Sequence, residues 1–429
     1  MAGRSKEIEV ANPLPVNLRI LLKLWLGFLI VFNTSTGFSC PAIFLANSIP
    51  YKNKYEFQRK NISLYAFERG LWVQKAIQFN DIKSDGTINY DLKANRLKAA
   101  LKPSDRIVVH PQSFSKKAPS GVKFPCSSTK MIELRNGRSY GYLVFCKDEQ
   151  KQLDPQIHYN AEERILQANR YSYSHDSSNH LNFKSINLKI NRSDETIAYD
   201  AEQLIRADVK NFFTMNFKAG DVTASLEKDF TGSVSYLALL RFYLKILFFS
   251  IDISLTPEVH FFRDSLYMPM SLYSPVNAQR YLNKGSGIFY SWKTSPKLEW
   301  SKSKSKMPRF IAKGKYHKEF KSYCRRKYCT FTLQGLLDKQ DIRMIFSIDQ
   351  SLVEKKFYPQ VYWDMQKPID SFEEDLSDDP QGRMGVFFET SQLPKGGHFW
   401  DFWVSMGKNY RYCPISIRLK SLSAHKSKR

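Results

Sequence analysis

"SVSYLALLRFYLKILFFSIDISLT", residues 233–256, contains the pattern that decides the fold class. From Phe249 to Thr256, apolar and polar residues alternate one by one. A β-strand points successive side chains to opposite faces, so this alternation is typical of a strand with one buried face. The second half of the stretch therefore predicts a half-buried β-strand.

The first half of the stretch fits two structures. Leu237, Leu240, Leu244 and Leu247 recur at helical spacing with charged residues off that face, which is typical of an amphipathic helix in a core or on a membrane surface. The charges of Arg241 and Lys245 argue against a membrane-spanning helix. The aromatic content and the strand that follows favour a buried strand, which we expect here.

Similar alternation recurs in "INLKI", residues 186–190, and in "CPISIRLKS", residues 413–421. Several such strands separated by turn residues predict a mainly β protein with antiparallel, sandwich-like sheets and a few short helices. An α+β fold is the alternative, because residues 63–76, 92–101 and 161–169 also fit helices.

Changes in composition along the chain predict its organisation. We expect an export signal at 1–39, an N-terminal α+β or β domain at 40–150, a polar connection at 151–182, a β-rich domain at 183–300, a basic segment at 301–328, a C-terminal β-rich domain at 329–421 and a basic tail at 422–429.

The N-terminal stretch "LRILLKLWLGFLIVFNTSTGFSC", residues 18–40, fits a cleaved export signal. Its uninterrupted apolar run, Leu24–Phe32, is shorter than the roughly 20 residues that cross a membrane as a helix. Cleavage after Ser39 would make Cys40 the first residue, and the site partly resembles the acylation motif of bacterial lipoproteins. Lipidation at Cys40 and an uncleaved anchor remain alternatives.

Six cysteines are an even number, so disulfide bonds are expected in an oxidising compartment. Cys324 and Cys329 in "CRRKYC" are the first predicted pair, because four intervening residues can close a hairpin. Cys126 with Cys146 is the second. A zinc site is less suited to this spacing, since no second pair of cysteines or histidines lies near.

The net charge of +24 favours anionic partners, and the charge is concentrated between residues 302 and 327. This segment is predicted either as a solvated loop, as a surface that binds anions, or as the partner of the acidic stretch at 364–379. The candidate anion-binding residues are Lys302, Lys304, Lys306, Arg309, Arg325, Arg326 and Lys327.

Three tryptophans, Trp363, Trp400 and Trp403, are candidates for stacking on sugar rings, with core packing as the alternative. No nucleophile elbow, phosphate loop or zinc-protease helix occurs in the sequence, so we assign no catalytic residue, metal or cofactor. His175 and His180 are expected in a surface loop.

These patterns together predict an exported, non-enzymatic protein that binds an anionic membrane surface or a glycan. It would work in the periplasm or cell envelope of a bacterium, or otherwise outside the cell, where nucleic acid is the least available partner. The alternatives are an exported hydrolase of an envelope polymer, whose carboxylates only the fold would bring together, and a membrane-embedded envelope component. The oligomeric state has no signature in the sequence.

Overall fold

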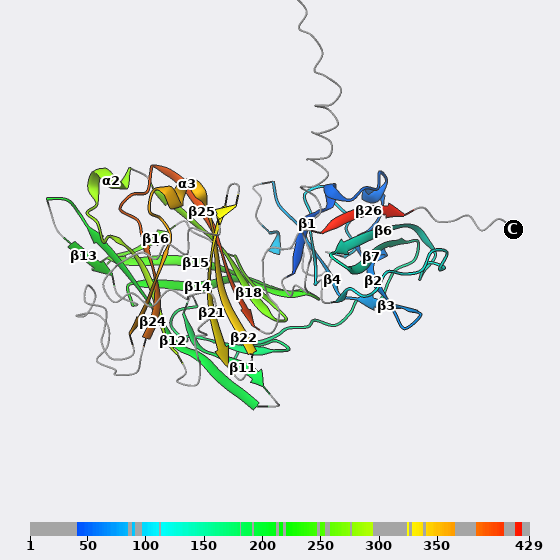
Figure 1. Ribbon diagram of the computed structural model, residues 1–429, viewed down its shortest axis with the longest axis horizontal. Helices are drawn as coiled ribbons and strands as arrows, with labels where there is room; N and C mark the ends of the chain where they lie inside the picture. Colours follow the sequence, from blue (N-terminus) through cyan, green and yellow to red (C-terminus); the bar gives the residue numbers. More distant parts are fainter. Residues whose placement is uncertain are drawn as a thin grey trace, which may run out of the picture. The chain divides into compact units, whose positions relative to one another are not determined.

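The chain divides into two units, Met1–Thr36 and Gly37–Arg429. The computed structural model (Figure 1) describes residues 41–84, 88–90, 97–110, 113–180, 182–190, 193–211, 214–217, 220–246, 249–253, 258–274, 277–294, 324–325, 328–337, 340–364, 383–406 and 417–422. All of these residues belong to the second unit. Within them, no helix has the length and apolar character needed to cross a membrane.

The fold class is mainly β with several antiparallel sheets, which confirms the prediction from the alternating pattern. One large sheet, here called the β12 sheet, has the strand order β23-β24-β19-β12-β11-β10-β9-β8, and β13 also pairs with β12. Its strands are β8 (His158–Asn160), β9 (Ile165–Gln167), β10 (Tyr171–His175), β11 (Phe183–Ile190), β12 (Ser193–Asp208), β13 (Thr214–Phe217), β19 (Gly287–Thr294), β23 (Pro359–Asp364) and β24 (Arg383–Glu389).

The second large sheet, the β15 sheet, has the order β14-β15-β17-β18-β25-β22-β21-β20, and β16 also pairs with β15. Its strands are β14 (Val222–Thr231), β15 (Ser235–Ile246), β16 (Phe249–Ile253), β17 (Glu258–Phe262), β18 (Ser265–Ser274), β20 (Cys324–Arg325), β21 (Tyr328–Leu337), β22 (Gln340–Asp349) and β25 (Gly396–Met406).

Two smaller sheets come mostly from the N-terminal part of the described chain. The β5 sheet has the order β1-β5-β4 and the β7 sheet the order β26-β6-β7-β2-β3. Their strands are β1 (Ala42–Leu45), β4 (Ile77–Asn80), β5 (Arg106–Val109), β2 (Ile62–Glu68), β3 (Leu71–Lys75), β6 (Ser128–Asn136), β7 (Ser139–Cys146) and β26 (Arg418–Leu422). The short helices are η1 (Ala46–Ser48), η2 (Lys54–Glu56), η3 (Arg59–Asn61), α2 (Ala278–Tyr281) and α3 (Gln350–Glu354).

Residues 235–246 and 249–253 form two paired strands, β15 and β16, with Phe242 opposite Ile253. The helical alternative for its first half is wrong. Tyr236 and Leu240 are buried on one face of β15, and Leu237 is buried on the other. A strand that is covered on both faces has an almost continuous run of apolar residues in its sequence. In such a run, leucines can fall at helical spacing by chance, so their spacing does not indicate a helix.

Two of the expected helices are strands instead. Residues 63–76 lie in the antiparallel β2–β3 pair, which reverses at Arg69 and Gly70, both with positive φ. Such a turn matches the twist of a hairpin and stops a helix. In residues 161–169, Arg164 also has a positive φ, and β9 follows it directly.

The two large sheets enclose the main core, in which buried side chains of the β12 sheet meet those of the β15 sheet. Residues 183–300 and residues 329–421, which were expected as two domains, both contribute strands to each large sheet. The opposite face of the β15 sheet supplies Phe262, Ile345 and Trp403 to a second core that includes Ile107 and Val109 of the β5 sheet. The β15 sheet is therefore covered on both faces.

Candidate functional site

A cavity of about 260 Å³ lies between the two large sheets. Both sheets contribute walls, because alternate residues of each strand face the space between them. The lining residues are Tyr173, Phe183, Ile186, Gln203, Ile205, Ile288, Tyr290, Trp292, Val386 and Phe388 from the β12 sheet, and Val222, Phe242, Leu266, Met268, Met270, Met344, Phe346, Trp400, Phe402, Val404 and Met406 from the β15 sheet.

Register places the β15-sheet wall in a continuous row across three strands. Met268 of β18 lies opposite Phe402 of β25, which in turn lies opposite Phe346 of β22. Met344 lies opposite Val404 in the same way. Methionine is unbranched and polarizable, so a wall rich in methionine can adapt to different apolar shapes.

The two walls differ in polarity, and among the described residues that line the cavity no side chain is charged. The β12-sheet wall includes four residues with polar groups, Gln203, Tyr173, Tyr290 and Trp292. Among the described residues of the β15-sheet wall, Trp400 is the one that has a side-chain nitrogen or oxygen. Burial raises the pKa of the Tyr173 and Tyr290 hydroxyls well above the ordinary value, so both are neutral in solution near pH 7.

Leaving such a cavity empty is costly. Unfilled apolar space inside a protein lowers its stability, because the side chains that line it lose packing contacts. Smaller apolar cavities, of about 150 Å³, exclude water and bind apolar molecules. The arrangement is therefore chemically suited to holding an apolar molecule.

A cluster of titratable side chains lies on the other face of the β15 sheet. The Tyr267 hydroxyl donates a hydrogen bond to Asp401 Oδ1 at 2.8 Å. Glu258 Oε2 lies 3.5 Å from His260 Nε2 and 3.9 Å from Arg106 Nη1. Burial raises the pKa of Asp401. Burial acts on Glu258 in the raising direction, but the hydrogen bonds from His260 and the Ile88 N–H and the charges of His260 and Arg106 together outweigh it, so the pKa of Glu258 lies below its usual value.

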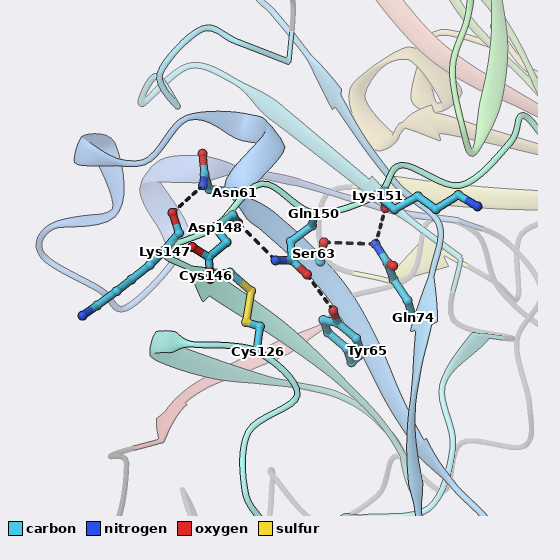
Figure 2. The surroundings of a disulfide bond; sticks show 10 residues. All are labelled: Asn61, Ser63, Tyr65, Gln74, Cys126, Cys146, Lys147, Asp148, Gln150 and Lys151. Atoms are coloured by element: carbon cyan, nitrogen blue, oxygen red, sulfur yellow. Dashed lines mark hydrogen bonds between the residues drawn. A yellow bond between two sulfur atoms is a disulfide. The ribbon is translucent and has the colours of Figure 1, made fainter.

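The predicted pair Cys126 and Cys146 forms a disulfide, with 5.9 Å between the Cα atoms (Figure 2). The segment that follows Cys146 is tied to the neighbouring β2 and β3 region by side chains. Asn61 Nδ2 donates to the Lys147 carbonyl at 2.9 Å, and the Tyr65 hydroxyl donates to Gln150 Oε1 at 2.9 Å. In the other predicted pair, Cys324 lies opposite Cys329 in the β20–β21 ladder, and Cys329 is disulfide-bonded.

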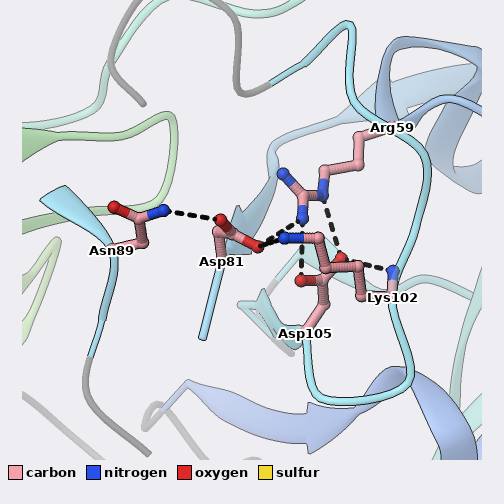
Figure 3. Close-up of polar contacts among 5 residues, drawn as sticks. All are labelled: Arg59, Asp81, Asn89, Lys102 and Asp105. Carbon is pink, nitrogen blue, oxygen red and sulfur yellow. Dashed lines mark hydrogen bonds and ion pairs between the residues drawn. The ribbon is translucent and has the colours of Figure 1, made fainter. Parts of the chain in front are cut away.

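Figure 3 shows a buried ionic cluster around Arg59. Its guanidinium donates from Nε and Nη2 to the two oxygens of Asp105, at 2.9 and 2.8 Å, and from Nη2 to Asp81 Oδ1 at 2.9 Å. Lys102 Nζ also reaches Asp81 Oδ1, at 3.0 Å. The three central side chains are almost completely buried, so this cluster holds the N-terminal region together rather than facing a ligand.

The predicted site residues fall in different places. Trp400 and Trp403 are buried, with 6% and 1% exposure, so neither presents a ring face at the outer surface, and Trp400 lines the internal cavity instead. Trp363 lies on β23 and Arg325 on β20, but their side chains are outside the described part of the structure. Cys40, Lys302, Lys304, Lys306, Arg309, Arg326 and Lys327 also lie outside the described residues.

The prediction that His175 and His180 belong to a surface loop is wrong for His175. This residue is buried at the end of β10, with the Tyr173 ring centroid 4.7 Å away and the Phe261 centroid 5.9 Å away. Burial, and then the charge of His180, lowers the pKa of His175 to about 4. Within the described residues, no three His, Cys, Asp or Glu side chains group closely enough to hold a metal ion.

Sequence reasoning missed the cavity itself. The alternation in "SLYMPMSLYS", residues 265–274, and "GGHFWDFWVSM", residues 396–406, could have identified residues of one wall. The size of the space between two sheets depends on how the facing side chains fit, which no pattern within one strand reveals.

Comparisons with known proteins identify no family. No protein-family model and no curated protein matches the sequence. Among solved structures, a protein in the glycosyl hydrolase family 38 from Enterococcus faecalis is similar with a TM-score of 0.42 and 9% identity, over 92% of this chain and 47% of that one. An alpha-mannosidase from Enterococcus faecalis V583 is similar with a TM-score of 0.43 and 9% identity, over 91% of this chain and 45% of that one. This chain thus spans less than half the length of either structure, and a likeness at this level carries no conclusion about activity.

Proposed function

We propose that this chain is a non-enzymatic binding protein that holds an apolar molecule between its two large sheets. The observation that carries the proposal is the cavity of about 260 Å³, whose described lining residues are mostly apolar. A preformed concave site with apolar walls and a few polar groups is the usual form of a small-molecule binding site. Filling it would also remove the free-energy cost of the empty space.

We also propose that the protein works at an anionic membrane surface after export. Without residues 1–39, which carry four basic and two acidic side chains, the net charge is 24 − 2 = +22. This charge supports attraction to anionic head groups, to which the basic segment around Lys302 and Arg325 would contribute. The leader-like stretch 18–40 supports export to the periplasm or cell envelope in a bacterium, or to the exterior otherwise. An anionic surface is also where apolar ligands with lipid character would be exchanged.

Thermal unfolding with apolar ligands tests the proposed binding. A ligand that binds only the folded protein stabilises it by about 2.7 kcal/mol when its concentration is 100 times the Kd. We expect decane or decan-1-ol to raise the Tm of the full chain, and solvent extraction followed by mass spectrometry to detect a co-purified apolar molecule. Native protein that neither gains stability with any alkyl ligand nor carries an extractable one would contradict the proposal.

A pair of substitutions localises the binding. Val404→Phe places a ring inside the cavity and is expected to abolish the ligand-induced rise in Tm. Val73→Phe, on β3 of the β7 sheet, is the matched control and should leave that rise unchanged. An equal loss of the rise in both variants would show that the ligand binds elsewhere or not specifically.

Hydrolysis of an envelope polymer is a second candidate function, supported by one observation. Glu258 and Asp401 lie on the same face of the β15 sheet with pKa values displaced in opposite directions, as an acid and base pair requires. The test is turnover of a panel of chromogenic glycosides. Activity that is lost in Asp401→Asn while the fold is retained would support it, and absence of turnover across the panel would remove it.

A further inference from the structure

We infer that one end of the β7 sheet is the surface through which the protein docks onto an anionic lipid bilayer. This inference rests on the proposed work at a membrane and adds the part of the chain that makes the contact. The residues of this end, here called the tip surface, are Arg69, Leu71, Lys117, Arg135, Arg138, Tyr140 and Arg418.

Strand register gathers the tip surface at a single end of the sheet. The β6–β7 hairpin turns next to Arg138, with Arg135 opposite Tyr140. Because β2 runs antiparallel to β7, the β2–β3 hairpin, which turns at Arg69, lies at the same end. β26 begins there too, since Arg418 lies opposite Arg135. Segments far apart in the sequence thus meet at this end of the sheet.

Positive charges lie close together on the outward face of this end. The Tyr140 ring contacts two of them, with Lys117 Nζ 5.8 Å and Arg135 Cζ 5.7 Å from its centroid. Arg135 and Arg418 are both exposed and lie directly opposite each other in the β26–β6 ladder. Like charges in that position destabilise a sheet. An anion bound across them would offset the repulsion.

The carboxylates of these strands do little to neutralise the tip surface. Among the described residues of the β7 sheet they are Glu68, whose Oε1 lies 2.6 Å from Lys75 Nζ, and Glu133, which is buried two residues before Arg135. The segment 113–127, which packs against this face through Ala118, adds three lysines and no acidic residue. The charge of this end is therefore complementary to an anionic surface.

An exposed leucine beside the cations favours a bilayer over a soluble polyanion. Leu71 is 70% exposed and directly follows Arg69 and Gly70, both of which have positive φ. Trp72 and Tyr140 are half-buried at the same end, and these two residue types are enriched where proteins meet membrane interfaces. A soluble polyanion would leave Leu71 in water, whereas a bilayer would bury it below the head groups that the cations bind.

Binding of the full chain to lipid vesicles tests this inference. The apparent Kd is measured by co-sedimentation with vesicles of phosphatidylcholine alone and with vesicles containing about one third phosphatidylglycerol, which the native chain should prefer. Arg135→Gln and Arg418→Gln should each weaken binding to the anionic vesicles about fivefold, which corresponds to about 1 kcal/mol for each basic residue. Leu71→Ser should weaken it about tenfold. The leader-like stretch 18–40 is present in every variant, so the differences report on the tip surface.

Matched substitutions on other sheets are the controls. Phe399→Ser removes an apolar side chain from β25 that is also 70% exposed, and Lys184→Gln removes an exposed cation from β11. Neither should change binding. Without vesicles, Arg418→Gln should raise the urea midpoint slightly, because it removes the repulsion from Arg135. Weaker binding in a variant that is at least as stable as the native chain cannot come from loss of the fold.

The outcomes separate this inference from the proposed function. Native affinity for anionic vesicles in both Leu71→Ser and Arg418→Gln would show that another part of the chain makes the contact. Binding to dextran sulfate but not to anionic vesicles would identify a soluble polyanion as the partner and overturn the inference. A native chain that binds both kinds of vesicle equally would refute the proposed work at an anionic membrane itself.

Discussion

His175 illustrates how a polar residue in a polar stretch of sequence can end up in a core. Asn179, in the turn that follows β10, is bound to β14: its Nδ2 donates to the Val222 carbonyl at 2.7 Å, and its carboxamide oxygen accepts from the Ala224 N–H at 2.9 Å. That anchoring draws the end of β10 against the aromatic rings of the core. Sequence composition could identify the turn but not the distant backbone that binds it.

The lowered pKa of His175 makes stability depend on pH. Its pKa is about 4 in the folded protein and 6.5 in the unfolded chain, so between these values the unfolded chain binds more protons. Stability contributed by the neutral ring is fully present above pH 6.5 and is lost as the pH falls towards 4, by an amount on the order of 3 kcal/mol.

We expect His175→Phe to flatten the fall in the free energy of unfolding between pH 6.5 and pH 4, measured by urea denaturation. His158→Phe is the control, because His158 is exposed on β8. An identical pH dependence in His175→Phe and the native protein would show that other groups cause the fall.

Arg59 is the residue whose removal should cost the most stability in the N-terminal region. Arg59→Met would leave Asp105 and Asp81 buried without their main cation, and breaking a buried pair in this way typically costs 3–5 kcal/mol. Arg59→Lys should retain only part of this stability, since a lysine cannot donate to both carboxylates in the same forked geometry.

The adjacent Lys60 provides the control for this measurement. Its ion pair with Glu149, at 2.7 Å, is partly exposed, so Lys60→Met should cost less than about 1 kcal/mol. The comparison is made by denaturant unfolding of the three variants. Similar losses of unfolding free energy in Arg59→Met and Lys60→Met would contradict the expectation that a buried ion pair contributes more stability than an exposed one.

At the scale of elements, alternation predicted strands well where one face is buried and the other is not. β11 shows this pattern, with Ile186, Leu188 and Ile190 buried between less buried neighbours. Apolar spacing suggested a helix where the structure has strands in two situations. One is a strand covered on both faces, as in β15, and the other is a tight hairpin that interrupts a helical pattern, as at Arg69 and Gly70. In each case tertiary packing, which the local sequence does not contain, overrode local preference.

The disulfide between Cys126 and Cys146 should stabilise the β6–β7 hairpin, because it restricts the conformations open to the unfolded chain. The residues are 20 apart in sequence, and closing a loop of that length removes unfolded-state entropy equivalent to about 3 kcal/mol. We expect the Cys126→Ser, Cys146→Ala double variant to unfold at a lower denaturant concentration than the oxidised native protein.

The two single variants provide the control, because either one already prevents the bond. If the disulfide acts by cross-linking, both singles should lose nearly as much stability as the double variant. If the loss of stability in the double variant instead equals the sum of the losses in the two single variants, the effect comes from packing of the two side chains, since independent packing effects are additive.

At the scale of the whole molecule, the sequence could supply residues that line the cavity but not the cavity. Alternation in β18 and β25 marks which side chains point inward, while the pairing of the two large sheets depends on contacts between segments far apart in the chain. Met268 and Phe388, for example, reach the same space from strands more than a hundred residues apart. The candidate site is thus a property of the assembled sandwich.

Filling the cavity from the opposite wall should raise the stability of the ligand-free protein. Val386 faces the space from β24, opposite Tyr290 in the β19–β24 ladder, so Val386→Phe replaces empty volume with packed atoms and should increase the free energy of unfolding by about 1 kcal/mol. Val108→Phe is the matched control, because Val108 is completely buried in the second core, where an added ring should overpack the site and cost about 1–3 kcal/mol. Both variants are compared with the native chain by urea unfolding after solvent extraction of bound molecules.

The free energy of unfolding should rise in Val386→Phe and fall in Val108→Phe only if the space between the sheets is empty without a ligand. A fall in both variants would mean that the protein itself already fills this space.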